Sequence, residues 1–275
     1  ERLPMLPLHE PAPDPGPQID RAAELQQKWG TLRGQVWEIG RHRLMCGDAT
    51  SAVDIRQLVL APTQLAFTSP PYSDVREYEM GAFDWTKLMV GVSEQVFSAS
   101  PLHFVVNLGL VHHDRQVDIY WAEWLAHCAS IGWPLFGWYV WDKGWAMPGE
   151  WNGRLAPAHE FLFHFNQAPD HANKWVATHT IPKHSHTFRQ KDGTLRGATS
   201  PDKIGQPFKI PDSVIRAGVH HSADIGHPAI MGIELAQFII QTWSDTGETV
   251  LDPFLGSGTT MVAEEQLGRI CYGVE

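Results

Sequence analysis

The stretch VLDPFLGSGTT, residues 250–260, decides the fold class of this chain. An apolar run leads into a loop with Gly256 and Gly258, and the next residues, SGTTMVAEEQLG, have the composition of a helix. RICYGVE (269–275) then has the composition of a buried strand. The glycines let a ligand approach the backbone closely, and the first N–H groups of the helix attract an anion. The stretch therefore predicts a strand–loop–helix–strand unit that binds a nucleotide-like molecule.

Glu275 supports a ribose-binding role for this unit. It follows Asp252 by 275 − 252 = 23 positions, close to the spacing of about 20 for an acid that accepts hydrogen bonds from ribose hydroxyls. Met261 stands where a GxGxxG motif has its third glycine, and no Gly-Lys-Ser/Thr follows. Neither a dinucleotide nor a P-loop site is therefore expected, and a glycine turn without any ligand is the structural alternative.

Apolar runs and helical patterns alternate along the rest of the chain. Strands that alternate with helices are typical of a doubly wound, mostly parallel sheet, so we predict an α/β protein with a Rossmann-like fold. Residues 1–35 are expected to form a proline-rich arm and a short helix, 36–275 the main domain, and 168–225 an irregular insertion within it. We expect helices over 20–29, 54–60, 84–99, 115–131 and 226–244, a hairpin over 37–50, and strands over 64–68, 101–109, 135–144, 159–165 and 248–254.

The composition narrows the class of protein. Among 275 residues, 43% are hydrophobic and 19% are charged, which is typical of a globular chain. No apolar run reaches the roughly 18 residues of a membrane span, and no secretory signal opens the sequence. Cys46, Cys128 and Cys271 are isolated, so we expect a reducing cytoplasm, no disulfide framework and no metal site. The tryptophans at 121, 124, 133, 138, 141 and 145 are expected in the core.

TSPPYSD, residues 68–74, is the second informative motif. The apolar run Leu65–Phe67 predicts a short buried strand, which must end at the prolines because they cannot donate ladder hydrogen bonds. Tyr72 follows where an α/β sheet opens its ligand crevice, at the carboxyl ends of the strands. On its own, the motif also fits a stiff turn.

Together the two motifs resemble those of the DNA amino-methyltransferases that depend on S-adenosylmethionine. DPFLGSGTT is similar to their cofactor motif. SPPY is similar to their catalytic motif, which begins with Asp, Asn or Ser and ends with an aromatic residue. The order of the motifs resembles the β group, and the resemblance covers about residues 36–275. It implies a Rossmann-like methyltransferase fold, S-adenosylmethionine as cofactor, and methyl transfer to an exocyclic amino group of a DNA base.

The resemblance assigns catalytic roles to the SPPY residues. Ser69 and the Pro70 carbonyl would accept hydrogen bonds from the target amino group, Pro71 would stiffen the loop, and Tyr72 would stack on a flipped base. Ser at the first position favours cytosine N4, and adenine N6 stays open. No Pro-Cys motif occurs beside the cysteines, which argues against methylation of cytosine C5.

Further positions match the cofactor motifs. Gly47-Asp48-Ala49 matches an element whose acid lies near the adenine of the cofactor, although a plain turn is the alternative for Asp48. His227 matches a motif at the methionine end, in which Met231-Gly232 replaces the usual lysine and proline, so the two threonines that open the last helix are expected to take over. The residues predicted to bind the cofactor are Asp48, Ala49, His227, Asp252, Phe254, Gly256, Ser257, Gly258, Thr259, Thr260 and Glu275.

A basic segment lies inside an acidic chain. The net charge is −10, yet residues 171–216 hold eight Lys or Arg against three Asp, 8 − 3 = +5. This concentration predicts phosphate contacts and target recognition, with a solvated loop as the alternative. The predicted DNA-binding residues are Lys174, Lys183, Arg189, Lys191, Arg196 and Lys203.

The resemblance also implies partners and a setting. Double-stranded DNA is the expected partner, in the cytoplasm of a bacterium or from a phage, with no membrane. A homodimer is compatible with the resemblance, and the proline-rich start indicates an upstream domain in a longer chain. A catalytically silent DNA-binding module and a methyltransferase for RNA or a small molecule stay open. Asp142, Lys143, His159 and Glu160 lie in segments that resemble the family's target side, where we expect structural pairs and assign no chemistry.

Overall fold

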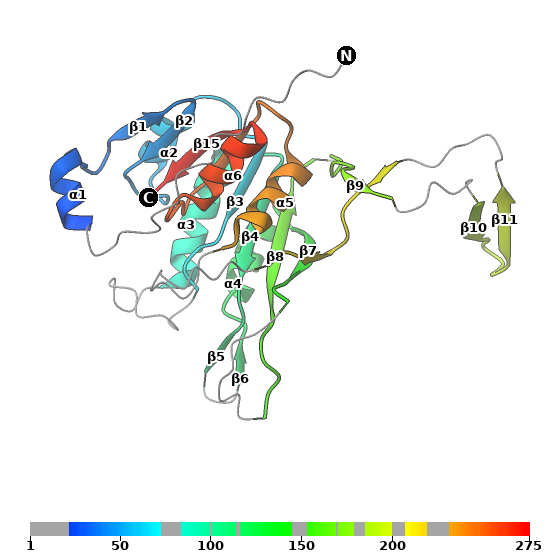
Figure 1. Cartoon of the computed structure of the whole chain (residues 1–275). Coiled ribbons are helices and arrows are strands. Elements are labelled where there is room, and N and C mark those ends of the chain that lie inside the picture. The colour runs from blue at the N-terminus through cyan, green and yellow to red at the C-terminus, as the bar shows by residue number, and fades with distance from the viewer. Residues whose placement is uncertain are drawn as a thin grey trace, which may run out of the picture.

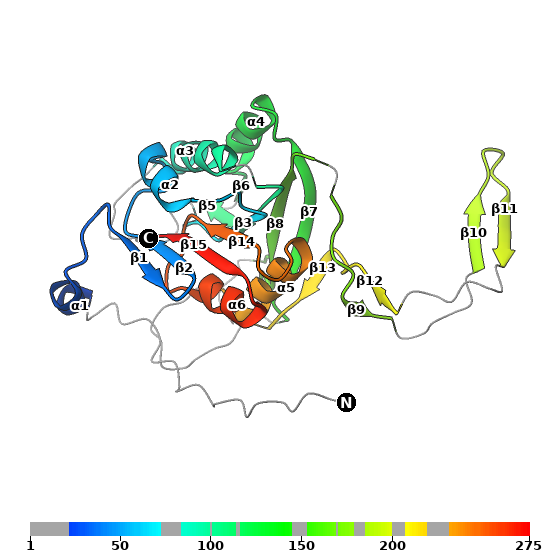
Figure 2. The same cartoon turned by 90° about the horizontal axis from the view of Figure 1, so that it is seen from above.

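Nine strands form one sheet among the residues that the structure describes, and helices pack on both of its faces (Figure 1 and Figure 2). The computed structural model describes residues 22–72, 84–99, 101–113, 116–144, 153–168, 170–178, 185–199, 207–218 and 231–275. Along the sheet the strands are β1 (Val36–Ile39), β2 (His42–Met45), β15 (Ile270–Val274), β14 (Thr249–Asp252), β3 (Leu65–Thr68), β4 (His103–Leu108), β8 (His159–Asn166), β7 (Leu135–Asp142) and β13 (Val214–Arg216).

Most strands run in one direction. β2, β15, β14, β3 and β4 are parallel neighbours, and β8 is antiparallel to both β4 and β7. β13 is parallel to β7, and β1 is antiparallel to β2. The prediction of a doubly wound, mostly parallel sheet is therefore confirmed. Because the parallel strands share one direction, their carboxyl ends meet along one edge of the sheet, which positions the candidate site.

Helices cover the sheet from two sides. Figure 2 shows α2 (Ala52–Leu58), α3 (Trp85–Ser98) and α4 (Ala122–Ser130) on one face. α5 (Ile233–Trp243) and α6 (Thr259–Leu267) lie on the other face, and α1 (Ala22–Trp29) lies beyond the β1–β2 end. Successive side chains of β3 point to opposite faces of the sheet and so pack into two hydrophobic cores. Leu65 and Phe67 pack with α5, whereas Ala66 packs with α2 and α3.

A buried polar chain links β4, β8 and β7 near the start of β4. His103 Nδ1 lies 3.0 Å from His164 Nε2, and His164 Nδ1 lies 3.0 Å from the Tyr139 hydroxyl. His103 Nε2 reaches Asp170 at 3.1 Å. Burial lowers the pKa of His164 to about 3, and burial also lowers the pKa of His103. Both rings therefore stay neutral inside the sheet at neutral pH.

Outside the main sheet, the described residues form three two-stranded antiparallel sheets. β5 (Val111–His113) pairs with β6 (Gln116–Asp118), and β9 (Val176–Ala177) pairs with β12 (Phe208–Lys209). β10 (Ser185–Arg189) pairs with β11 (Leu195–Thr199), and both views draw this hairpin well apart from the sheet (Figures 1 and 2). The segment predicted to be irregular, 168–225, thus contains short strands, and its β13 joins the main sheet.

Two predicted helices are shorter than their sequence patterns indicate. The first part of the predicted helix 115–131 is wrong, because Gln116–Asp118 pairs as a strand with β5 and α4 begins only at Ala122. In the predicted helix 226–244, α5 begins at Ile233, and residues 226–230 lie outside the described ranges. Gly232 is extended, and a Cβ there would lie 2.7 Å from the Gly218 carbonyl oxygen, so the chain passes another backbone before the helix starts.

The prediction that six tryptophans lie in the core is confirmed only in part. The four at 121, 124, 133 and 141 are buried as expected. Trp138 is 52% exposed, so its core assignment is wrong, because the first half of β7 is open to solvent at both Phe136 and Trp138. Trp145 lies outside the described residues. Across the described ranges, no helix is long and apolar enough to cross a membrane.

Candidate active site

The carboxyl ends of β3 and β14 are joined by a direct side-chain bond. The Thr68 hydroxyl donates to Asp252 Oδ1 at 2.7 Å, and the Phe254 backbone N–H donates to the same oxygen at 3.0 Å. Asp252 is only 2% exposed. Its burial raises the pKa of the carboxyl to about 6, against the opposing hydrogen bonds of Thr260 and Thr68. Asp252 thus links the carboxyl ends of β3 and β14. Phe254, whose backbone N–H donates to Asp252, packs against the core.

The glycine loop after Asp252 leaves open space above its backbone. Gly256 has φ +55° and Gly258 has φ +89°, and a Cβ built at either position meets no atom of the described residues within 4 Å. Gly258 is also the N-cap of α6. Ser257 is exposed and Thr259 partly so, whereas Thr260 is buried below them. The left-handed conformations need glycine, and the open backbone and helix start form a cradle for a polar ligand.

Glu275 closes this cradle at the end of β15. Its Oε2 accepts from the Gly256 N–H at 2.7 Å, and the side chain is exposed. Its backbone connects to the β2 end, since its N–H donates to Met45 and its carbonyl accepts from Gly47 at 3.1 Å. The carboxylate of Glu275 is therefore held beside the glycine loop and exposed to solvent.

Asp48 lies in the loop after β2. It accepts from both the backbone N–H and the hydroxyl of Thr50, at 2.8 and 2.6 Å, and pairs with Arg33 at 3.2 Å. The Thr50 hydroxyl, with help from the backbone and Arg33, lowers the pKa of this carboxyl despite partial burial. Ala49 beside it is buried. The carboxylate is ionised and anchored in a turn next to the Glu275 strand.

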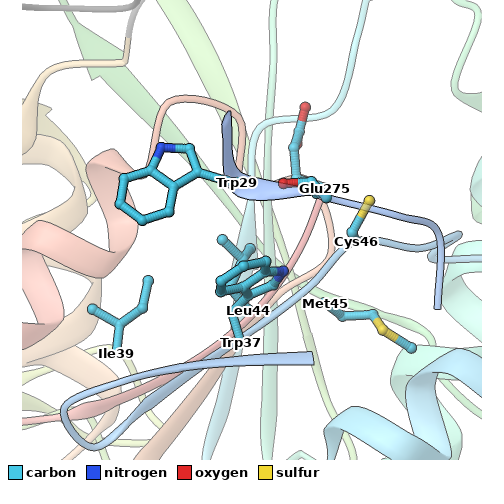
Figure 3. Close-up of a pocket in the computed structure, with 8 residues that line it drawn as sticks. Trp29, Trp37, Ile39, Leu44, Met45, Cys46 and Glu275 are labelled. Atoms are coloured by element: carbon cyan, nitrogen blue, oxygen red, sulfur yellow. The ribbon is translucent and has the colours of Figure 1, made fainter. Parts of the chain in front are cut away.

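An apolar pocket of about 500 Å³ adjoins Glu275. Figure 3 shows Trp29, from the end of α1, with Trp37, Ile39 and Leu44 of the β1–β2 hairpin around one space, and Cys46 and Glu275 at its rim. Thr31 and Met45 complete the lining. No residue in this lining except Glu275 was assigned to the site from the sequence.

The SPPY loop continues from β3 at the same edge. Ser69 is partly exposed and Pro70 is buried. The Trp85 indole donates to the Pro71 carbonyl at 2.8 Å, and Trp85 itself packs edge-on against Tyr120 and Trp124. The carbonyl of the second proline is therefore used to hold the loop on α3.

Tyr72 is held by Glu160, for which the sequence predicted only a structural pair, and by Asn107, which the sequence did not indicate. Its hydroxyl lies 2.7 Å from Glu160 Oε2, and Asn107 Nδ2 donates to the Tyr72 oxygen at 2.7 Å. Burial, with the Glu160 charge next in size, raises the pKa of the Tyr72 phenol well above its usual value. A Cβ at Gly109 would lie 2.8 Å from the Tyr72 ring, so the ring sits directly against that glycine.

The predicted DNA-binding residues are only partly within the described ranges. Lys183 and Lys203 lie outside them, as does His227 of the predicted cofactor set, and the Arg196 side chain is not described. Lys174 is exposed beside Asn173, which bonds to the end of α5, and Arg189 and Lys191 are exposed on the β10–β11 hairpin. Two other basic residues of the segment have local acidic partners, in the pairs Lys209–Asp212 and Arg216–Asp142.

The site thus joins an open glycine loop to a polar loop held on α3. The family described as DNA methylase, N6_N4_Mtase, matches residues 63–275. The chain belongs to this family. It is a DNA methyltransferase of the amino type, for cytosine N4 or adenine N6.

Curated relatives of this DNA methylase include bacterial methyltransferases. It is 25% identical to the type II methyltransferase M.ScaI of Streptomyces caespitosus, over 77% of this chain and 70% of that one. It is 26% identical to the orphan methyltransferase M.BamHII of Bacillus amyloliquefaciens, over 77% and 83%. The match to M.XycI of Xanthomonas campestris pv. cyanopsidis, at 28% identity, spans 52% of this chain and 41% of the relative.

Solved structures show the same fold. The cytosine-N4-specific PvuII DNA methyltransferase matches with a TM-score of 0.61 and 18% identity, over 86% of this chain and 82% of that chain. A DNA modification methylase of Thermus thermophilus, in complex with S-adenosyl-L-methionine, matches with a TM-score of 0.53 and 23% identity, over 85% and 87%. The Rossmann-like methyltransferase fold is therefore confirmed.

S-adenosylmethionine is the cofactor of this DNA methylase, and the residues present fit it. The open backbone at Gly256 and Gly258 leaves room for a ligand, and Glu275 presents an exposed carboxylate beside it. Asp48 offers a second ionised acceptor across the β2 end.

Proposed function

We propose that the chain methylates the N4 amino group of a cytosine turned out of duplex DNA. The hydrogen bond between Thr68 and Asp252, 2.7 Å long, carries the proposal. It places Ser69, the next residue after Thr68, at the end of the strand that is locked to the cofactor motif. The Thr68–Asp252 hydrogen bond thus fixes the proposed acceptors for the target amino group relative to the loop proposed to bind the methyl donor.

The cofactor supplies an electrophilic methyl group, and the chain supplies the geometry. Glu275 and the open backbone of the glycine loop at Gly256 and Gly258 bind and orient the cofactor, and Asp48, Ala49, His227 and Thr259 extend that site. Ser69 and the Pro70 carbonyl accept hydrogen bonds from the target amino group. These acceptors hold the nitrogen so that its lone pair points to the methyl group, and a rigid loop keeps them in place before the base arrives.

Tyr72 provides the platform for the base. Its hydroxyl is fixed by Glu160 and Asn107, and its ring rests against Gly109. A fixed aromatic ring stacks on an extruded base without further loss of side-chain freedom. No covalent bond to the protein is needed for transfer to an amino group.

Ser69 at the first position of the motif favours cytosine N4. The fold similarity to the cytosine-N4-specific PvuII enzyme is compatible with this choice. Adenine N6 is the second candidate, because the family includes both amino targets.

The basic hairpin supports a nucleic-acid polymer as substrate. Arg189 and Lys191 are exposed on β10–β11 and the turn that follows β10, apart from the acidic bulk of the chain. We assign them phosphate contacts, together with Lys174, Lys183, Arg196 and Lys203 of the same segment.

Labelled S-adenosylmethionine and unmodified DNA test the proposal. After incubation, the DNA is digested to nucleosides and the product is identified by mass spectrometry. N4-methylcytosine is expected. Detection of N6-methyladenine would identify adenine, not cytosine, as the target base. Absence of any methylated nucleoside across varied DNA would overturn the proposed activity.

Ser69→Ala tests the assigned acceptor. Loss of a hydrogen bond in the transition state is expected to lower kcat about ten- to a hundredfold. Cofactor affinity should stay unchanged, as measured by calorimetry on the same sample. An unchanged kcat would contradict the role of the hydroxyl.

A further inference from the structure

An apolar pocket opens beside Glu275, at the edge of the candidate cofactor site. Its volume is about 500 Å³, which lies in the usual range for ligand pockets. Trp29 from the end of α1 and Trp37 from β1 face this space, together with Ile39 and Leu44 (Figure 3). Trp29 is 59% exposed and Ile39 is 48% exposed. Large apolar side chains around an open pocket are typical of a binding site.

The position of Glu275 limits which ligand suits the pocket. Its carboxylate accepts from the Gly256 N–H at 2.7 Å and lies at the pocket rim. In the proposed function Glu275 binds the cofactor, through the ribose hydroxyls that its spacing from Asp252 predicts. The adenine is bonded directly to that ribose, so its ring must lie close to the rim. Adenine has two apolar faces and a polar edge, and it is therefore the part of the cofactor that suits aromatic walls.

The segment that follows Trp29 also reaches the acid predicted for the adenine. Arg33 Nη2 lies 3.2 Å from Asp48 Oδ2. The backbone of this segment is attached to the end of β2, since the Gly34 N–H donates to the Cys46 carbonyl at 2.7 Å. One stretch of chain thus lines the pocket and contacts Asp48.

A buried donor in the same pocket lacks an acceptor. The Trp37 indole N–H has no hydrogen-bond partner among the residues that the structure describes. Figure 3 shows its nitrogen on the side of the ring toward Cys46. Unpaired buried donors are rare in folded proteins, because they lose their hydrogen bonds to water without a replacement. The ring nitrogens of adenine are acceptors, so a bound adenine would supply the missing partner.

We propose that Trp29 stacks on the adenine of the cofactor in this pocket, and that Arg33 orients Asp48 to accept from the adenine amino group. Both residues precede position 63, where the family match begins. The chain thus completes its cofactor site with residues outside the matched part. The inference rests on the proposed function, in which Glu275 binds the cofactor. The competing explanation is that Trp29 only attaches α1 to the β1–β2 hairpin.

Calorimetric titration with S-adenosylhomocysteine tests the stacking, since this demethylated cofactor keeps the adenine and needs no DNA. Trp29→Ala should weaken binding about ten- to a hundredfold, the range for an aromatic ring that stacks on a base. Trp29→Phe keeps a ring and should recover most of the affinity. Trp138→Ala is the matched control, because Trp138 is 52% exposed and lies outside the pocket lining. It should bind as wild type, and unchanged affinity in Trp29→Ala would overturn the proposal.

A second ligand separates stacking from recognition of the amino group. S-inosylhomocysteine carries oxygen in place of the adenine amino group. Trp29→Ala should weaken both ligands by the same factor, because stacking tolerates either ring. Arg33→Ala should weaken only S-adenosylhomocysteine, and so lower the preference for adenine about two- to tenfold. A preference equal to that of wild type would overturn the role of Arg33.

Tryptophan fluorescence gives a readout that a purely structural contact would not change. S-adenosylhomocysteine should quench the emission of the wild-type protein. The quenching should decrease in Trp29→Phe but not in Trp138→Phe. Equal quenching in Trp29→Phe and wild type would show that the adenine lies elsewhere, and so contradict the proposal.

Glu275→Gln and the DNA assay separate this inference from the proposed function. Glu275→Gln should weaken cofactor binding, and unchanged affinity would remove the assignment on which the inference rests. Binding that is weakened in Trp29→Ala, in a protein that yields no methylated nucleoside in DNA, would instead support the inference and remove the proposed methylation.

Discussion

At the residue scale, the contact between Gly109 and the Tyr72 ring leaves no room for a methyl group. We expect Gly109→Ala to displace the ring, since the new Cβ would lie 2.8 Å from Tyr72 Cε2. Overpacking of this kind costs about 1–3 kcal/mol. Steady-state kinetics should show kcat reduced about tenfold or more, because the proposed stacking of the target base depends on the position of this ring.

Gly218→Ala is the matched control for this change. Among the residues that the structure describes, a Cβ at Gly218 meets nothing within 4 Å. Neither glycine has a left-handed φ, so both substitutions suit the backbone. The control should keep wild-type kcat. If Gly109→Ala also kept it, Tyr72 would not need its observed ring position.

A second residue-scale prediction concerns Glu264, a fully buried carboxyl on α6 with the weakly donating Cys271 thiol beside it. Burial raises its pKa well above the usual value. The unfolded state therefore loses this proton first as pH rises above about 4.5, and stability decreases with pH over that window. Thermal unfolding of Glu264→Gln should show a gain relative to wild type that is larger at pH 8 than at pH 5. A gain independent of pH would contradict the assignment.

The residue scale also shows why sequence patterns indicated some residues of the candidate site and not others. Asp252, the two glycines and Glu275 lie in one short segment whose spacing carries meaning, as does SPPY. Glu160 lies 88 positions from Tyr72, and Asn107 lies 35 positions away. Asn107 and Glu160 are brought together by the pairing of β4 with β8, and this pairing cannot be predicted from the spacing of nearby residues.

At the element scale, the buried histidine chain makes the junction of β4, β8 and β7 sensitive to acid. The pKa of His164 is lowered to about 3 by burial and by the neighbouring His103. Below about pH 6.5 the unfolded state binds a proton that the folded state refuses, so stability should fall by about 1.4 kcal/mol per pH unit for this residue.

His164→Gln tests this prediction. The variant keeps a hydrogen-bonding side chain between Tyr139 and His103 but no longer titrates. Denaturant unfolding from pH 7 to pH 5 should therefore show a shallower loss of stability than in wild type. The exposed His171, replaced in the same way, should leave the slope unchanged. Equal slopes in His164→Gln and wild type would show that the ring is not held neutral.

Element boundaries were the least predictable part of the fold. The pattern over 115–131 has helical spacing, yet Val117 and Ile119 are β-branched, and the segment before α4 pairs with β5. The strands over 64–68, 101–109 and 159–165 were predictable because parallel and central strands are apolar on both faces. Pairing partners decide the marginal segments, and those partners are distant in sequence.

At the scale of the whole molecule, charge is divided between an acidic body and a basic hairpin. We expect Arg189→Glu with Lys191→Glu to weaken DNA binding at least tenfold, because two phosphate contacts become repulsive. The slope of log affinity against log salt should decrease by about 2 × 0.9. Cofactor affinity and thermal stability should not change, since both side chains are exposed and the hairpin lies apart from the sheet.

Arg56→Glu with Lys87→Glu is the matched control, with the same change in charge on exposed positions of α2 and α3. Fluorescence anisotropy with labelled duplexes at several salt concentrations measures all three proteins. If the control lost as much affinity as the hairpin variant, net charge rather than the hairpin would govern DNA binding.

The strand order also affects how the chain folds as it is synthesised. β2 and β3 are close in sequence, but β15 and β14 separate them in the sheet. The two central strands therefore leave the ribosome after all the strands that they join. Until residues 249–274 emerge, β2 and β3 each present an unpaired edge, the kind of surface on which chains aggregate. The bond between Thr68 and Asp252 closes a loop of 184 residues, so the candidate site is completed only when β14 and β15 enter the sheet.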